Sequence, residues 1–136
     1  MTVVVGFTPK PQGWAALTAA VAQARASGSR LVVVNSARGD TLVEDTWAAD
    51  DDLARVGKQL AASGLEHTLH RPVRGLDGAD EVLAAAEEHD AGLVVIGIRH
   101  RSAVGKLILG SDAQRILLGA RCPVLAVKAA EPSPGS

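Results

Sequence analysis

The sequence predicts a single α/β domain in which helices cover both faces of a doubly wound, five-stranded parallel sheet. Short runs of β-branched apolar residues recur along the chain, and the stretches between them have the apolar spacing of helices. This alternation is typical of parallel strands joined by helical crossovers. With 136 residues, the chain has the length of one domain with one core. No apolar run approaches the roughly 20 residues that a membrane-spanning helix requires.

Four of the five predicted strands are short and almost continuously apolar. Such runs indicate strands that are covered on both faces of a parallel sheet. The remaining strand, residues 65–73, is more polar and is predicted to lie at an edge. The apolar runs are residues 3–5, 31–34, 93–96 and 124–127.

The first two predicted helices each turn one apolar face toward the sheet. In the first, apolar residues recur at helical spacing until Gly28, a residue type that commonly ends helices. The second is predicted to begin at residues 50–52, three aspartates that complement the positive end of a helix, and to end at Gly64. The inward residues are Trp14, Leu17, Val21 and Ala24 in the first helix and Leu53, Val56 and Leu60 in the second.

The last two predicted helices are shorter. The third begins near Asp77, a candidate N-cap. The fourth covers about residues 112–118, opens with a capping box formed by Ser111 and Gln114, and ends at Gly119. The inward residues of the third helix are Ala79, Val82, Leu83 and Ala86.

Composition bounds the classes of function. The chain has 14 basic and 15 acidic residues, a net charge of -1, and only one Phe and two Trp as aromatic residues. Nucleic-acid binding through a basic face or stacked bases is therefore not expected. The chain starts with an apolar strand and has no basic leader, so we expect a cytoplasmic protein with no membrane contact.

Cysteine and histidine usage predicts neither a disulfide nor a metal site. Cys122 is the only cysteine, and burial as a small apolar residue is its expected role. His67 and His70 are three positions apart in a strand, so their side chains point to opposite faces.

Residues 129–136 are small and polar and contain two prolines, which predicts a flexible C-terminal tail after a domain of residues 1–128.

The segment from Gly97 to Ser111 is the candidate anion-binding site, because it leaves a buried strand and enters a helix. Glycine permits close approach of the backbone to a ligand, and a helix start offers free N–H groups to an anion. A Walker A loop does not fit, since His100 and Leu107 occupy positions that require Gly and Ser or Thr. A dinucleotide fingerprint would require a compact glycine triplet after the first strand, where residues 6–11 read Gly-Phe-Thr-Pro-Lys-Pro.

The remaining pattern resembles the universal stress protein family. Its nucleotide-binding members carry Gly, two residues, Gly, nine residues, Gly, then Ser or Thr, and this chain matches at Gly97, Gly110 and Ser111 with His100 in place of the second glycine. The resemblance extends from the first strand to Val127, and residues 115–127 look very like the family's closing helix and strand. It implies strand order 3-2-1-4-5, a homodimer formed through the last strand, Val124-Leu125-Ala126-Val127, and, in one subgroup, ATP held between strands 1 and 4.

On the phosphate side, the resemblance places Gly97, Gly110, Ser111 and Asp112 at the positions that face the phosphates. Ser111 there offers both a hydroxyl and a backbone N–H. Near the ribose, Thr8, followed by Pro9, stands where the family usually has an Asp. Thr8 can form one hydrogen bond but cannot act as an anionic partner.

Two further regions belong to the candidate site. Ser36, after the second strand, aligns with a residue whose backbone meets the adenine in binding members, and a backbone contact survives the change of side chain. Arg99, His100 and Arg101, with Lys106, concentrate positive charge beside the helix start. A side chain at His100 opposes binding if that position needs a bare backbone, whereas the arginines favour it because guanidinium groups pair well with phosphate.

Two hypotheses follow. In the first, the chain is a dimeric stress-response protein that binds ATP or a related adenine nucleotide, with or without Mg²⁺, as a regulatory ligand. In the second, it is a nucleotide-free member of the same fold that acts as a dimeric interaction or protective module. The sequence shows no catalytic residues, since no carboxylate is placed to orient a Ser–His pair, and at most slow ATP hydrolysis is expected. A phosphoacceptor receiver domain is rejected because Phe7-Thr8 and Arg74-Gly75 stand where it requires carboxylates.

Overall fold

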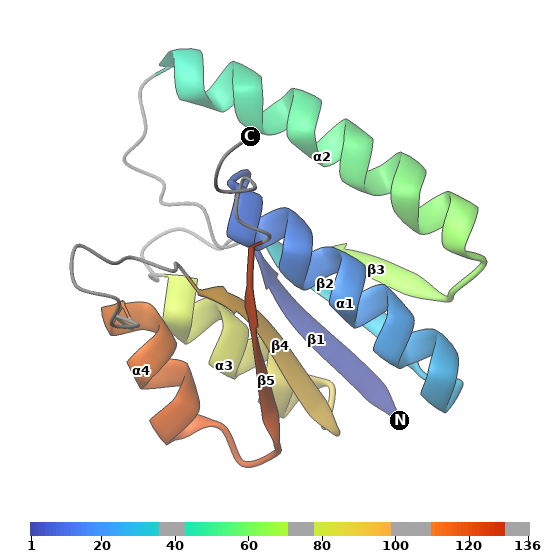
Figure 1. Ribbon diagram of the computed structural model, residues 1–136, viewed down its shortest axis with the longest axis vertical. Coiled ribbons are helices and arrows are strands. Elements are labelled where there is room, and N and C mark those ends of the chain that lie inside the picture. The colour runs from blue at the N-terminus through green and yellow to red at the C-terminus, as the bar shows by residue number, and fades with distance from the viewer. Residues whose placement is uncertain (36–42, 71–77, 99–109, 130–136) are drawn as a thin grey trace, which may run out of the picture.

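The computed structural model describes residues 1–35, 43–70, 78–98 and 110–129. Strands and helices alternate along the chain, as the apolar pattern predicts (Figure 1). In chain order the elements are β1 (Thr2–Phe7), α1 (Pro11–Ser27), β2 (Arg30–Asn35), α2 (Val43–Ser63), β3 (His67–His70), α3 (Gly78–Glu88), β4 (Leu93–Ile98), α4 (Ser111–Gly119) and β5 (Val124–Lys128).

The five strands form one parallel sheet in the order β3-β2-β1-β4-β5, which confirms the predicted fold class and strand order. The chain winds outward from β1 to β2 and β3, then crosses back to β4 and β5. The polar strand β3 lies at one edge, as predicted, and β5 lies at the other. The carboxyl ends of β1 and β4 therefore adjoin at the point where the winding direction changes.

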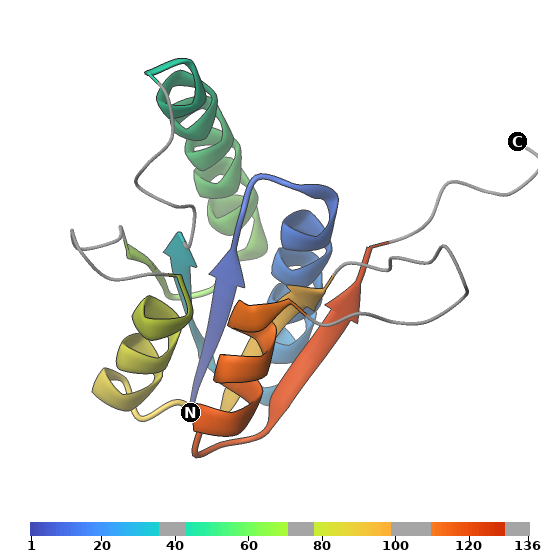
Figure 2. The same ribbon diagram turned by 90° about the vertical axis from the view of Figure 1, so that its left-hand side faces the viewer.

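Helices cover both faces of the sheet. Alternate residues of β1 point to opposite faces: Val3 and Val5 belong to the core under α1 and α2, and Val4 belongs to the core under α3 and α4. All three valines are at most 1% exposed. Figures 1 and 2 show α1 and α2 on one side of the sheet and α3 and α4 on the other.

The inward faces of the helices agree with the sequence analysis. Leu17 and Ala24 of α1 and Val56 and Leu60 of α2 are buried, and so are Ala79 and Val82 of α3. Helix α1 ends at Gly28, whose left-handed backbone (φ 64°, ψ 34°) lets its N–H cap the carbonyl groups of the last turn. Within the part of the chain that the structure describes, no helix is both long and apolar enough to cross a membrane.

The predicted start of the second helix was wrong. Helix α2 begins at Val43, seven residues before the aspartates at 50–52, which therefore lie inside the helix and not at its amino end. The intervening residues include neither Gly nor Pro, so no backbone constraint prevents the helix from starting early. Asp77, the expected N-cap of α3, lies outside the described residues, as does the tail beyond Ala129.

Candidate functional site

The candidate site lies at the carboxyl edge of the sheet, where β1 and β4 are neighbours. Val5 pairs with Val95, so the next residues of both strands run to the same edge. Thr8 and Pro9 follow β1 directly, and Gly97 is the penultimate residue of β4. Figure 2 shows helix α4 starting at this edge and running back along the sheet. In open α/β sheets, ligands usually bind outside this edge, where the winding direction changes.

The turn between β1 and α1 is packed tightly onto the start of the helix. The backbone N–H of Lys10 donates to the carbonyl oxygen of Thr8 (2.8 Å), and the carbonyl of Lys10 accepts from the N–H groups of Gly13 (2.8 Å) and Trp14 (3.1 Å). A Cβ atom at Gly13 would collide with the Thr8 carbonyl oxygen. Gly13, which the sequence analysis did not single out, is thus required for the position of Thr8.

Gly97 is required by the backbone of α1. A Cβ atom there would collide with the carbonyl oxygen of Gln12, in the first turn of α1. Its φ is not positive, so conformational freedom is not the reason for glycine at this position. The close approach that the sequence predicts at Gly97 therefore includes a contact within the protein itself.

The environment of Gly110 is different. Gly110 is the N-cap of α4, is exposed, and has an ordinary extended backbone (φ -72°, ψ 166°). A Cβ atom would meet no described atom within 4 Å. Neither packing among the described residues nor backbone conformation requires glycine here.

The predicted capping box at Ser111 was wrong. Ser111 is the first residue of α4, one position past the N-cap, and no described side chain caps the helix through a hydrogen bond. Instead, the carbonyl of Gly110 accepts the N–H of Gln114 as the first backbone bond of the helix (3.1 Å). The exposed Ser111 and the half-buried Asp112 lie in the first turn, where N–H groups lack intrahelical partners.

The remaining predicted site residues have no described placement. Ser36, Arg99, His100 and Arg101 lie outside the described residues. Of the predicted set, the structure brings Thr8 and Pro9 together with Gly97 at adjoining strand ends. It places Gly110, Ser111 and Asp112 at the amino end of α4.

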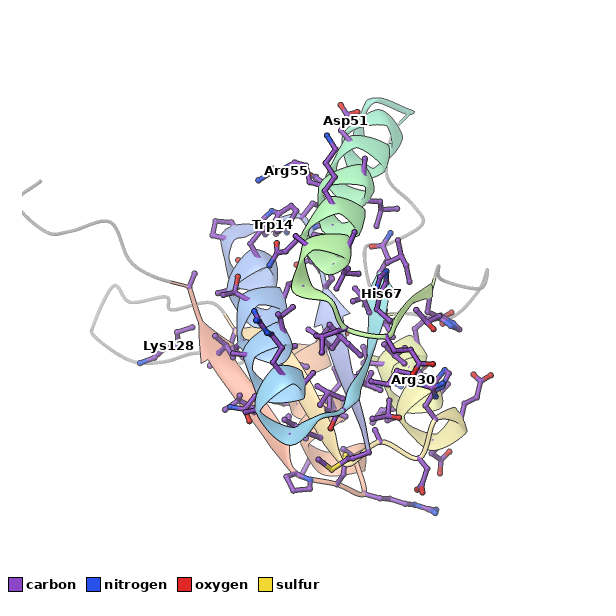
Figure 3. The ribbon with its side chains drawn as sticks, turned by 90° about the vertical axis from the view of Figure 1, so that its right-hand side faces the viewer. Trp14, Arg30, Asp51, Arg55, His67 and Lys128 are labelled. Atoms are coloured by element: carbon purple, nitrogen blue, oxygen red, sulfur yellow. The ribbon has the colours of Figure 1, made fainter. Side chains whose placement is uncertain are left out.

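An aromatic and cationic stack adjoins the site on the face covered by α1 and α2. The edge of one ring meets the face of the other between Phe7 and Trp14, with centroids 4.9 Å apart and planes at 77°. The guanidinium carbon of Arg55, on α2, lies 4.4 Å from the centre of the Trp14 ring (Figure 3). We define Phe7, Trp14 and Arg55 as the stack. From the sequence, Trp14 was predicted only as a core residue, because helical spacing carries no information about a partner on another helix.

The described histidines do not gather into a metal site. The side chain of His70 approaches buried Glu81 (Nε2 to Oε2, 3.6 Å), whereas His67 is exposed and its Nδ1 lies 2.9 Å from the carbonyl oxygen of Leu65. Their different surroundings are consistent with the predicted opposite faces. Within the described ranges, no group of three or more His, Cys, Asp or Glu residues could hold a metal ion.

Cys122 is half-buried between α4 and β5 and packs against the core under α3 and α4. Burial raises the pKa of its thiol above the ordinary value. This environment agrees with the predicted role as a small apolar residue and opposes reactivity near neutral pH.

Comparison with known proteins identifies a family. Residues 1–128 match the universal stress protein family. A universal stress protein of Mycolicibacterium smegmatis is 43% identical over 126 residues, which cover 93% of this chain and 96% of that protein. Among solved structures, a universal stress protein of Archaeoglobus fulgidus has a TM-score of 0.77 and 35% identity over 94% of this chain and 98% of the other. A second structure, the universal stress protein from the same organism in complex with dAMP, has a TM-score of 0.71 and 29% identity with the same coverage.

Proposed function

The chain belongs to the universal stress protein family, and from this premise we propose that it binds ATP or a related adenine nucleotide as a regulatory ligand. In this proposal the nucleotide lies at the carboxyl edge between β1 and β4. Thr8, Pro9 and the backbone of Ser36 face the nucleoside. The phosphates face Gly97, Gly110, Ser111 and Asp112.

The observation that carries the proposal is the uncapped amino end of α4. Gly110 is an exposed N-cap with no side-chain hydrogen bond, and nothing in the described structure occupies the space where a side chain would project. As far as the described residues go, the first-turn N–H groups and the positive end of the helix dipole are therefore available to an anion. The relative in complex with dAMP supports adenine nucleotides as the class of ligand.

The sequence supplies the positive charge that phosphates require. Arg99, His100 and Arg101 precede α4 in the chain, and Lys106 follows in the same segment. We propose that the arginines pair with the phosphates, since guanidinium groups bind phosphate oxygens through two parallel hydrogen bonds. If ATP is the ligand, Mg²⁺ accompanies it through the phosphate oxygens. We expect hydrolysis to be slow at most.

A calorimetric titration tests the proposal. The protein is stripped of nucleotide by unfolding and refolding, then titrated with ATP, AMP and dAMP, each with and without Mg²⁺. Saturable heat at a stoichiometry of one per chain is expected. No heat at millimolar nucleotide, together with no nucleotide found by mass spectrometry in protein purified without added ligand, would overturn it.

Two observations support the nucleotide-free alternative. The contact with Gln12 already explains glycine at Gly97 without any ligand, and Thr8 supplies no carboxylate for a ribose. The alternative predicts that the parent protein binds no nucleotide, and that Thr8→Asp combined with His100→Gly creates binding. Titration of this double variant beside the parent separates the two functions.

We also propose that the protein is a cytoplasmic homodimer that pairs through β5. This strand is an edge of the sheet, and its residues are half-buried or exposed, so its outer backbone groups are open to pairing. Ala126 is exposed at the centre of the strand. A dimer in sedimentation equilibrium that becomes a monomer with Ala126→Arg would support this arrangement; a monomeric parent would rule it out.

A further inference from the structure

The first turn of α1 contacts two residues of the proposed nucleotide site, Thr8 and Gly97, through its backbone. On one side the Gln12 carbonyl rests against Gly97, and on the other Gly13 rests against the Thr8 carbonyl. These contacts are between backbone atoms, with no flexible side chain to absorb a displacement. A movement of this turn therefore moves Thr8, Gly97 or both.

The stack contacts this turn through Trp14. Trp14, in the same turn, packs edge-to-face on Phe7, which is 1% exposed and directly precedes Thr8. Arg55 covers the Trp14 ring from α2 and also lies 3.7 Å from the Asp52 carboxylate (Nη1 to Oδ1). Val56, the next residue of α2, is fully buried in the core shared with α1, so the backbone that carries Arg55 is anchored. Figure 3 shows Arg55 of α2 beside Trp14 at the start of α1.

We infer that Arg55, acting through Trp14, is a positioning residue that couples helix α2 to the affinity of the proposed nucleotide site. This inference rests on the proposed function. When Arg55 lies on Trp14, the first turn of α1 holds Thr8 and Gly97 in the relative positions that nucleotide binding requires. A partner or condition that draws α2 away weakens binding, and by linkage the bound nucleotide stabilises α2 by the same factor.

The experiment uses the full chain with Trp47→Phe, so that Trp14 is the only tryptophan. Arg55→Gln removes the cation, Arg55→Lys retains a cation that can contact the ring, and Lys58→Gln removes one exposed charge from the next turn of α2 as a matched control. Arg55 is 68% exposed in its side chain, so these variants are expected to fold. Trp14 emission with acrylamide quenching reports the stack, and calorimetry with dAMP reports the affinity.

The expected result is a graded series. Arg55→Gln increases quenching of Trp14 and weakens dAMP binding about two- to fivefold, the range that an exposed cation–π contact contributes. Arg55→Lys keeps Trp14 quenching and dAMP affinity close to those of the protein with Arg55, and Lys58→Gln changes neither. In the protein with Arg55, saturating dAMP slows hydrogen exchange in residues 51–63. The slowing is smaller in Arg55→Gln.

Three outcomes with the variants, and a fourth with the parent, would overturn the inference. If Arg55→Gln leaves both quenching and affinity unchanged, the stack does not hold the turn. If quenching rises and affinity does not fall, the stack exists but does not act on the site, while the proposed function still stands. If Arg55→Gln and Lys58→Gln weaken binding equally, long-range charge explains the effect. Absence of binding of ATP, AMP and dAMP by the parent would reject the proposed function and, with it, the coupling.

Discussion

The two outer glycines of the motif, Gly97 and Gly110, are equivalent in the sequence pattern but have opposite surroundings. Gly97 is pressed against the backbone of another element, and no side chain fits there. Gly110 faces open space among the described residues and has a backbone that any residue can adopt. Two glycines of one motif can therefore have different roles: packing requires Gly97, and we propose that a ligand meets Gly110. The first role is tested by stability and the second by binding.

The largest expected effect is the loss of stability in Gly97→Ala. Gly97→Ala places a Cβ atom against the Gln12 carbonyl, and relief requires a backbone shift of β4 or α1. We expect the free energy of unfolding to fall by about 3 kcal/mol, as for severe overpacking. Urea denaturation followed by circular dichroism measures it. Gly110→Ala is the matched control, with an expected loss of about 1 kcal/mol or less for a poorer N-cap. Equal losses would show that the two glycines do not differ.

The next effect concerns Gly13, on the other side of the same turn. Glycine to alanine inside a helix ordinarily stabilises it by up to about 1 kcal/mol. Here the added methyl meets the Thr8 carbonyl, so we expect a net loss of about 2 kcal/mol. Gly57→Ala, in helix α2 where a Cβ atom meets nothing within 4 Å, should stabilise the protein and serves as the control. A gain in both variants would contradict the tight turn.

A smaller effect comes from the ion pair that joins α3 to α4, the helix that Gly110 opens. Arg115 Nη2 donates to Asp80 Oδ1 at 2.6 Å, and both side chains are more than one third exposed. Because water screens such a pair, Arg115→Gln should cost only about 0.5 kcal/mol, and less at high salt. Urea denaturation at two salt concentrations checks this. A loss above 2 kcal/mol would mean that α4 depends on this pair to stay in place.

The smallest effect concerns the reactivity of Cys122, which lies between α4 and β5. Burial raises the pKa of the Cys122 thiol, so the reactive thiolate forms at higher pH in the folded protein than in the unfolded chain. Alkylation by iodoacetamide at pH 8 should be slower for the folded protein than for the same protein in urea. The two rates should converge as the pH rises through the pKa of the folded state. Equal rates at pH 8 would indicate that Cys122 is not buried in the folded protein.

The sequence was a good guide where the signal is local and periodic. Apolar runs located the strands, and polar β3 was correctly placed at an edge. The start of α2 was misplaced because three aspartates resemble a helix start, although nothing before them prevents helix formation. At α4 the shift from Ser111 to Gly110 as N-cap is a single residue, but it replaces the predicted side-chain cap with a residue that has no side chain.

The contacts that define the site could not be predicted from the sequence, because they join distant positions. Gly97 meets Gln12, and Trp14 meets Arg55, with no local pattern that connects either pair. A glycine two residues after a helix-starting proline, as in Pro11-Gln12-Gly13, was the one available signal of a tight approach. The motif therefore located the candidate site, and the structure shows that Gly97 packs against another element whereas Gly110 meets no described atom.

The most direct test of the central claim is a calorimetric titration of Gly110→Asp and Gly110→Asn with dAMP and ATP, beside urea denaturation of both variants. Each new side chain can cap α4, so both variants should be more stable than the parent by a few tenths of a kcal/mol or more. The aspartate places a negative charge where the phosphates are proposed to lie. The account predicts at least a tenfold loss of nucleotide affinity in Gly110→Asp, and a smaller loss in Gly110→Asn, with stability retained in both. Unchanged affinity in a well-folded Gly110→Asp would contradict it.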